Sequence, residues 1–234
     1  MLRHYFVSSI VLTTLFSLAS LMSSCSGGQG NADQEKEKAD SVKATGKKAD
    51  DGVKKILFFG TSLTAGYGLD ITEAFPALIQ HKIDSLKLPY KVVNAGLSGE
   101  TSAAGKTRID WLLNQPFDIM VLELGANDGL RGLPLSQTKE NLQEITDKVK
   151  KKYPKVRFVL AGMQMPPSMG ADYAQEFKSI FPELAKKNNM VLIPFLLQGV
   201  GGVPKLNQKD GIHPTVAGQK ILAENVWARL KGLL

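Results

Sequence analysis

The sequence predicts one three-layer α/β/α domain built on a five-stranded parallel sheet with a flavodoxin-like order. Two observations support this prediction. Short apolar runs, typical of strands buried on both faces, alternate with longer segments whose apolar residues recur at helical spacing. The sequence also shows no internal repeat and no second apolar core, so the alternation describes a single doubly wound sheet joined by right-handed crossovers.

The first half of the domain gives two strands and two helices. Residues 56–59 (ILFF) are a continuous apolar run that Gly60 ends, as in a strand buried on both faces. Residues 74–86 place leucines and isoleucines at helical spacing, and residues 90–94 follow as a strand. The next helix spans residues 101–114, where Ile109, Leu112 and Leu113 fall on one side.

The second half continues the alternation. Residues 118–124 (DIMVLEL) form a buried strand, and residues 136–152 a helix that Ser136 is expected to cap. Pro214 is expected to begin the last helix, where its missing N–H costs nothing. The remaining predicted strands are residues 156–161 and 190–193, and the remaining predicted helices are residues 172–187 and 214–230.

The N-terminus predicts export. Residues 1–24 carry Arg3 as their only charge, followed by an apolar run over residues 5–22 and then small residues, the pattern of a secretory signal peptide. A transmembrane helix is the alternative, but the run is short and interrupted by serines and threonines.

Cys25 is the only cysteine, so no internal disulfide can form. It follows the sequence LMSS, which resembles a bacterial lipoprotein cleavage site, where the cysteine becomes the lipidated first residue. Met22 departs from the leucine that is usual there. The resemblance implies an exported lipoprotein, periplasmic or at the cell surface, whose membrane anchor is a lipid on Cys25. A stray thiol is the alternative.

Residues 26–53 are predicted to be a linker that, with Cys25, separates the signal from a domain over residues 54–234. The linker is rich in Gly, Ala, Asp, Glu and Lys, lacks aromatic residues, and cannot bury enough apolar surface to order itself. The domain has 23 basic and 16 acidic residues. Its lysines are mostly scattered, which favours a solvated surface over a phospholipid-binding one. Aromatic residues are not interleaved with the basic ones, so the sequence does not indicate a nucleic-acid partner.

Three glycine-rich loops are expected to meet at one edge of the sheet. In a sheet of order 2-1-3-4-5 the first strand lies between the second and third, so the loops at their carboxyl ends converge. These loops are residues 60–68, 94–101 and 125–132. Ser62 lies in the first of them, at the position where open α/β sheets bind their ligands.

A histidine with a nearby aspartate follows near the C-terminus, in the sequence Asp210-Gly-Ile-His213-Pro. The domain has one other histidine, His81, which the helical pattern places in solvent, so His213 is the candidate general base. With one accessible histidine and no cysteine, the domain lacks the set of ligands that a metal site usually needs. The chain also lacks GxxxxGK[ST], GxGxxG and GxSxG, which disfavours phosphate-loop, dinucleotide and α/β-hydrolase chemistry.

Four blocks carry a family resemblance: GTSLTAGYG, NAGLSGET, LELGANDGLRG and DGIHP occur in this order. They resemble the four blocks of the SGNH (GDSL) hydrolases, and the domain is most similar to the secreted thioesterase, lysophospholipase and arylesterase subgroup. The resemblance implies that Ser62 is the nucleophile and that Asp210 and His213 complete its triad. It also implies an oxyanion hole formed by Ser62, Gly99 and Asn127, with no cofactor and no metal.

The first block departs from the family pattern at two positions that are not catalytic. Thr61 stands where the family usually has Asp, and Thr64 where it often has Ser. Glu123 is also unusual, because it is a carboxylate in a strand that should be buried. It is expected either to pair with Arg131 or to cap a loop amide.

The implied function is a serine esterase that hydrolyses carboxylic esters through an acyl-enzyme. The substrate is a lysophospholipid, a thioester, or an aryl or alkyl ester, and the enzyme is expected to act as a monomer. Residues 162–170 and 195–204 are expected to flank the site, where their apolar side chains would contact an acyl chain or simply pack beneath loops. The alternatives are a carbohydrate O-acetyl esterase, which would need a shallow polar cleft, and a surface-tethered binding module without catalysis.

Overall fold

The computed structural model describes residues 52–234. The predicted signal peptide, Cys25 and nearly all of the predicted linker therefore lie outside the described residues. Among residues 52–234, the longest and most apolar helices still fall short of what a membrane crossing requires.

The five predicted strands form one parallel sheet in the order β2-β1-β3-β4-β5, which confirms the predicted fold class and topology. Gly60, the last residue of β1, aligns with Gly96 on one neighbouring strand and with Glu123 on the other. The carboxyl ends of β2, β1 and β3 therefore lie side by side. The strands are β1 Lys54–Gly60, β2 Tyr90–Gly96, β3 Ile119–Glu123, β4 Arg157–Ala161 and β5 Val191–Ile193.

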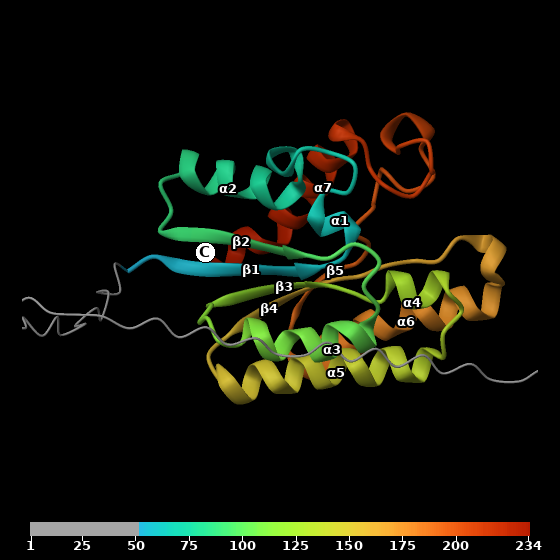
Figure 1. Ribbon diagram of the computed structural model, residues 1–234, viewed down its shortest axis with the longest axis horizontal. Helices are drawn as coiled ribbons and strands as arrows, with labels where there is room; N and C mark the ends of the chain where they lie inside the picture. The colour runs from blue at the N-terminus through green and yellow to red at the C-terminus, as the bar shows by residue number, and fades with distance from the viewer. Residues whose placement is uncertain (1–51) are drawn as a thin grey trace, which may run out of the picture. The chain divides into compact units, whose positions relative to one another are not determined.

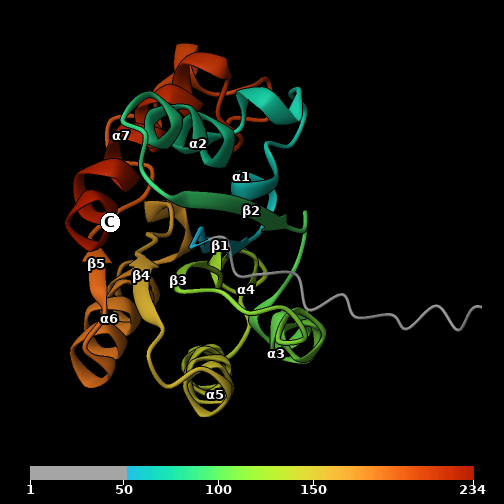
Figure 2. The ribbon, with the colours of Figure 1, turned by 90° about the vertical axis from the view of Figure 1, so that its left-hand side faces the viewer.

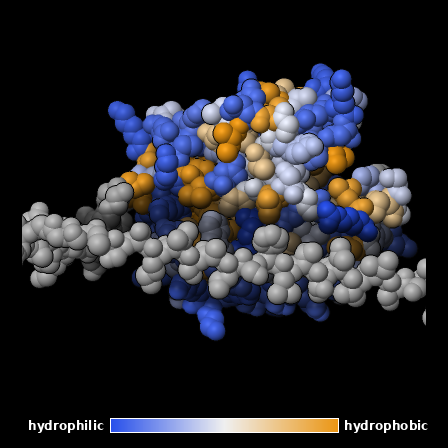
Figure 3. All heavy atoms as spheres, in the orientation of Figure 1, coloured by the Kyte–Doolittle hydropathy of each residue, from blue (hydrophilic) through white to orange (hydrophobic). Residues whose placement is uncertain are grey.

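Helices cover both faces of the sheet and give the domain three layers (Figures 1 and 2). On one face α2 packs against α7, and on the other α5 packs between α3 and α6. On the face shown in Figure 3, hydrophilic residues cover much of the helices, and hydrophobic residues show in separate patches between them. The long helices are α2 Phe75–Ser85, α3 Ser102–Leu112, α5 Leu135–Lys152, α6 Ala171–Asn188 and α7 Val216–Leu230.

The central strand shows why its sequence is continuously apolar. Successive side chains of a strand point to opposite faces, and both faces of β1 are covered by helices. The Phe58 ring contacts Phe75 of α2, with 5.6 Å between ring centroids. The Phe59 ring lies on the other face, where the guanidinium of Arg108 in α3 sits 4.3 Å from its centroid.

The five long helices each start one or two residues from the predicted position, and the two predictions that named a specific starting or capping residue were wrong. The helix α5 begins at Leu135, and no side chain caps it, so Ser136 lies inside the first turn. The helix α7 begins at Val216, and the Thr215 hydroxyl accepts a hydrogen bond from the third amide of the helix. Pro214 instead forms an isolated bridge that holds the segment before the helix extended.

The connecting loops contain short helices that the sequence pattern did not predict. The first of these, α1, starts at the candidate nucleophile, and α4 follows β3 at the same edge of the sheet (Figure 1). A four- or five-residue helix has too few apolar positions to show a period, so periodicity cannot find it. The short elements are α1 Ser62–Ala65, η1 Ile71–Glu73, α4 Ala126–Leu130, η2 Pro167–Met169, η3 Pro204–Leu206 and η4 Lys231–Leu233.

Candidate active site

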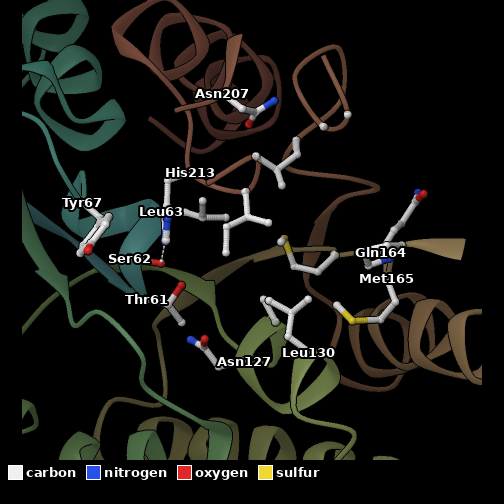
Figure 4. A pocket seen from close by; sticks show the side chains of 18 of the residues that line it. Thr61, Ser62, Leu63, Tyr67, Asn127, Leu130, Gln164, Met165, Asn207 and His213 are labelled. Atoms are coloured by element: carbon white, nitrogen blue, oxygen red, sulfur yellow. Dashed lines mark hydrogen bonds between the residues drawn. The ribbon is translucent and has the colours of Figure 1, made fainter. Parts of the chain in front are cut away.

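The structure brings Ser62, His213 and Asp210 into one hydrogen-bonded chain although they come from opposite ends of the domain. The Ser62 Oγ lies 2.9 Å from His213 Nε2 (Figure 4). The other ring nitrogen of His213, Nδ1, lies 2.7 Å from Asp210 Oδ2. If Nδ1 carries the proton donated to Asp210, Nε2 presents a lone pair to the serine hydroxyl. This is the arrangement that activates a serine for nucleophilic attack.

The turn around Gly211 fixes the Asp210 carboxylate. Gly211 has a φ of 77°, which favours glycine, and this conformation brings two backbone amides onto the carboxylate. Asp210 Oδ1 accepts hydrogen bonds from the N–H groups of Ile212 and His213, both at 3.0 Å. The backbone N–H of His213, then its ring, lower the pKa of Asp210 to about 2. Asp210 therefore stays ionised and can orient the imidazole throughout the neutral pH range.

Tyr67 and Gln208 support the histidine, and the sequence analysis did not identify either residue. The Tyr67 ring lies against the imidazole of His213, with 4.5 Å between centroids and 37° between the ring planes. Gln208 donates hydrogen bonds from Nε2 to the carbonyl of Tyr67 at 2.7 Å and to that of Pro214 at 3.0 Å. The only available signal was that Tyr67 lies in the first family block, because side-chain-to-backbone contacts leave no periodic pattern.

Three potential donors to an oxyanion line the same cavity as the Ser62 hydroxyl: the backbone amides of Ser62 and Gly99 and the side chain of Asn127. Within residues 52–234, neither backbone amide donates a hydrogen bond to the protein. Asn127 Nδ2 donates to the carbonyl of Glu100 at 3.0 Å, which orients the amide and leaves its second hydrogen free. Gly99 has a φ of 78°, so this position requires glycine for its backbone conformation.

The two expectations for Glu123 are now distinguished. Arg131 does not pair with Glu123 and instead donates to the carbonyl of Gly99 at 2.9 Å. The Glu123 carboxylate caps a loop amide, that of Thr61, at 2.8 Å, and also accepts hydrogen bonds from the hydroxyls of Thr61 and Thr64. Glu123 is completely buried, and burial raises its pKa.

Asp128 ties the third site loop to the helix that follows the second. It is almost fully buried and accepts hydrogen bonds from the amide of Ser102 at 2.8 Å and from its hydroxyl at 2.5 Å. Ser102 is the first residue of α3, so this contact fixes the start of that helix beside Asn127. The Asp128 contact thus sets the spacing of the two loops that carry the candidate oxyanion donors.

A cavity of about 720 Å³ opens beside the Ser62 hydroxyl (Figure 4). Both segments that the sequence placed around the site contribute to it, residues 162–170 and residues 195–204. Met163 and Met165 are also almost fully buried, so these segments both pack beneath the loops and line the cavity. The apolar side chains that line it are Leu63, Ala126, Leu130, Met163, Met165, Pro166, Phe195, Leu197 and Ile212. Between residues 52 and 234, no cluster of His, Cys, Asp or Glu could hold a metal ion.

Comparison with known proteins agrees with this geometry. A profile of the GDSL-like lipase/acylhydrolase family matches residues 58–221, a range that contains the whole triad. The chain belongs to this family. Among curated members of the family, the esterase TesA of Pseudomonas aeruginosa is 42% identical over 180 residues, which are 76% of this chain and 89% of TesA. The thioesterase 1/protease 1/lysophospholipase L1 of Escherichia coli is 38% identical over 180 residues, 76% of this chain and 84% of that protein.

Solved structures of SGNH hydrolases share the fold. A crystal structure of TesA is 40% identical, covers 77% of this chain and 100% of its own, and superposes with a TM-score of 0.74. The esterase EstA from Pseudoalteromonas, in a structure inhibited by monoethylphosphonate, is 32% identical, covers 77% of this chain and 98% of its own, and has a TM-score of 0.73. The family assignment and the site together make this protein an ester-hydrolysing SGNH enzyme.

Proposed function

We propose that the enzyme is a serine esterase that cleaves carboxylic esters with apolar acyl groups through an acyl-enzyme on Ser62. One observation carries the proposal. Ser62 Oγ lies 2.9 Å from His213 Nε2 at the wall of a cavity lined largely by apolar side chains. The polar machinery is therefore next to a space that suits an acyl chain.

In the first half of the reaction, Ser62 Oγ attacks the ester carbonyl carbon while His213 Nε2 takes the hydroxyl proton. The negative charge that develops on the carbonyl oxygen is stabilised by the amides of Ser62 and Gly99 and by the Asn127 side chain. When the bond to the leaving group breaks, His213 returns the proton to the leaving oxygen or sulfur, and the acyl group remains on Ser62.

In the second half, water replaces the leaving group. His213 takes a proton from the water, the resulting nucleophile attacks the acyl carbon, and the same donors stabilise the second oxyanion. Collapse of this intermediate releases the carboxylic acid and returns the proton to Ser62. Asp210 keeps the imidazole in the required tautomer and stabilises its protonated form in both halves.

The substrate class follows from the cavity and from the names of the relatives. A lysophospholipid, an acyl thioester, and an aryl or alkyl ester share an apolar acyl group and differ in the leaving group. Met163, Met165 and Leu130 offer the flexible apolar lining that an acyl chain needs. The curated relatives include a thioesterase/lysophospholipase and an arylesterase, which supports this range of leaving groups.

The two alternatives are less well supported. A carbohydrate O-acetyl esterase would need a shallow polar cleft, and the apolar lining argues against one. A catalytically silent binding module would have no reason to hold a serine, a histidine and an aspartate in hydrogen-bond contact.

A chain-length profile tests the proposal. The purified domain is assayed with p-nitrophenyl esters from acetate to dodecanoate, beside Ser62→Ala as the matched inactive variant. We expect kcat/KM to rise from acetate to a medium chain and Ser62→Ala to be inactive on every ester while remaining folded. Activity confined to acetate would favour the deacetylase, and no activity at all would favour the binding module. Activity of Ser62→Ala close to that of the wild type would refute the nucleophile assignment.

We also propose that the enzyme is an exported lipoprotein held at a membrane by a lipid on Cys25. Residues 1–24 have the composition of a signal peptide, and Cys25 follows a sequence that resembles a lipoprotein cleavage site. Such an anchor would keep the domain close to lipid substrates without using its catalytic face. We propose that the anchored enzyme acts as a monomer.

A further inference from the structure

Two residues that the sequence marked as unusual contact each other beneath the nucleophile. Glu123 is the last residue of β3, and Thr61 is the residue immediately before Ser62. Thr61 donates its backbone N–H to Glu123 Oε2 at 2.8 Å and its hydroxyl to Oε1 at 2.9 Å. Glu123 is fully buried and Thr61 is 1% exposed, so water competes little with these hydrogen bonds.

Glu123 also reaches the other side of the nucleophile. The hydroxyl of Thr64, two residues after Ser62, donates to Glu123 Oε2 at 2.8 Å. One carboxylate thus binds the residues on both sides of Ser62 and fixes the short helix α1 on the end of the sheet. We call this arrangement of Glu123, Thr61 and Thr64 the carboxylate clamp.

The rest of the turn is shaped around the clamp. A Cβ on Gly60 would lie 2.1 Å from Thr64 Oγ1 and 2.6 Å from Glu123 Oε2, so only glycine leaves room for both groups. Among the ion pairs of residues 52–234, none involves Glu123, and its carboxylate depends on the hydrogen bonds that Thr61 and Thr64 donate. A buried carboxylate without its donors is strongly unfavourable, so the clamp resists any rotation of the turn that would break them.

A second contact holds the same turn from the opposite strand. Asn94 of β2 donates its side-chain amide to the carbonyl of Thr64 at 2.9 Å and accepts from the amide of Gly96 at 2.9 Å. This contact links α1 to the start of the loop that carries Gly99. Glu123 and Asn94 thus hold α1 from the two strands that flank β1.

We propose that Glu123, acting through Thr61 and Thr64, is a positioning residue that sets the direction of the Ser62 hydroxyl and amide for catalysis. The inference rests on the proposed role of Ser62 as nucleophile. Glu123 does not line the cavity, so it acts on the reaction only through the turn. Thr61 suits this clamp because its hydroxyl donates to a carboxylate, whereas an aspartate, usual here in the family, could donate only when protonated.

Thr64→Val tests the clamp most cleanly, because Thr64 is buried and does not line the cavity. Valine keeps the shape of the side chain and removes only the donor to Glu123. We expect kcat on p-nitrophenyl butyrate to fall roughly 10-fold with KM within about 2-fold, because a slightly misdirected nucleophile binds substrate normally and reacts slowly. Thr61→Val should lower kcat to a similar extent. Thr61→Ser and Thr64→Ser, which keep the hydroxyl donor, should retain most of the wild-type kcat.

Thr146→Val is the matched control for stability. Thr146 is equally buried and donates its hydroxyl to the carbonyl of Leu142 in α5, far along the chain from the site. It removes one buried hydroxyl donor, as each clamp variant does, and should leave kcat unchanged. Each kcat is calculated per reactive serine. The number of reactive serines is measured by complete reaction with a p-nitrophenyl phosphonate, which forms a bond to the serine oxygen and releases one nitrophenolate per site.

The outcomes separate this inference from the function on which it rests. If Ser62→Ala stays active and no phosphonate is bound, the nucleophile assignment fails. If Ser62 is labelled in every variant but Thr61→Val and Thr64→Val keep the kcat of the wild type per labelled site, the clamp has no positioning role. The same conclusion holds if the Thr146→Val control loses as much kcat as they do. Glu123→Gln, which keeps an acceptor for one hydroxyl, should fall between the wild type and the valine variants.

Discussion

Arg108 donates two hydrogen bonds to the Glu100 carboxylate, from Nε at 2.6 Å and from Nη2 at 2.5 Å. The Glu100 side chain is 1% exposed, so this is a nearly buried ion pair with the two-pronged geometry that only arginine provides. The carbonyl of Glu100 accepts the hydrogen bond that orients Asn127. The ion pair therefore fixes the loop that carries the Gly99 amide and that also orients the Asn127 side chain through the Glu100 carbonyl.

We expect Arg108→Lys to lower both stability and kcat. Lysine keeps the charge but loses the two-pronged contact, and leaving a buried carboxylate poorly paired typically costs about 3–5 kcal/mol. Arg108 is partly exposed, so water will offset some of this cost. Urea denaturation and kcat on p-nitrophenyl butyrate are the measurements, and Arg229→Lys on the exposed end of α7 is the control. Unchanged stability in Arg108→Lys would show that the ion pair does not hold the loop.

Asn127→Ala tests the side-chain donor of the oxyanion hole. We expect kcat to fall roughly 10²–10³-fold, the usual effect of removing one such donor, because the donor acts on charge that develops only in the transition state. Steady-state kinetics on a simple ester separates kcat from KM. An effect on KM alone would make Asn127 a residue that binds substrate in the ground state.

The lowered pKa of Asp210 predicts a particular pH dependence of stability. The pKa of about 2 lies below the ordinary value of 3.8, so ionised Asp210 stabilises the fold at neutral pH, and this contribution is lost as pH falls from about 4 to about 2. Asp210→Asn lacks the contribution at every pH. The difference in unfolding free energy between the two proteins should therefore be largest at pH 7 and should shrink below pH 4. A difference that stayed constant down to pH 2 would contradict the prediction.

The two histidines of the domain form a natural pair of variants. His213→Gln should remove nearly all activity, because glutamine cannot take a proton from Ser62. His81 is exposed on α2, and His81→Gln should leave both activity and its pH profile unchanged. Ester hydrolysis at several pH values is the measurement. If His81→Gln abolished activity and His213→Gln did not, the triad assignment would be wrong.

The sequence predicted the sheet and the meeting of the loops because both depend on strong, repeated signals. Buried parallel strands must be apolar on both faces, as Phe58 and Phe59 show, and this leaves a run that is easy to recognise. The glycines at or just after the ends of three neighbouring strands, β1, β2 and β3, marked the edge of the sheet where the site lies. The placement of Ser62, Asp210 and His213 followed from family blocks rather than from periodicity.

The contacts that hold the site could not be predicted in the same way. The partner of Glu123 depends on the exact turn of α1, and two partners were equally consistent with the sequence. The helix α7 starts at Val216 because the hydroxyl of Thr215 caps it, whereas composition favoured the nearby proline. Tyr67 reaches His213 from 146 positions earlier in the chain, a relationship that only the fold creates.

The proposed lipid anchor on Cys25 has a consequence for where activity is found. Cysteine is required because only a thiol can receive the lipid, and Cys25 is the single cysteine of the chain. The catalytic groups lie in residues 62–213, far along the chain from it. The anchor and the chemistry should therefore be separable by a single substitution.

Cys25→Ser in the full-length chain should block lipidation and move the protein out of the detergent-phase fraction. Activity on a soluble ester such as p-nitrophenyl butyrate should not change, because Ser62, His213 and Asp210 are untouched. Activity on a lipid ester embedded in a membrane should fall, because the enzyme is no longer concentrated at that surface. Ser26→Ala, which keeps the cysteine, is the matched control and should stay in the detergent phase. If Cys25→Ser remained with membranes after a high-salt wash, an uncleaved N-terminal helix would explain the attachment better than a lipid.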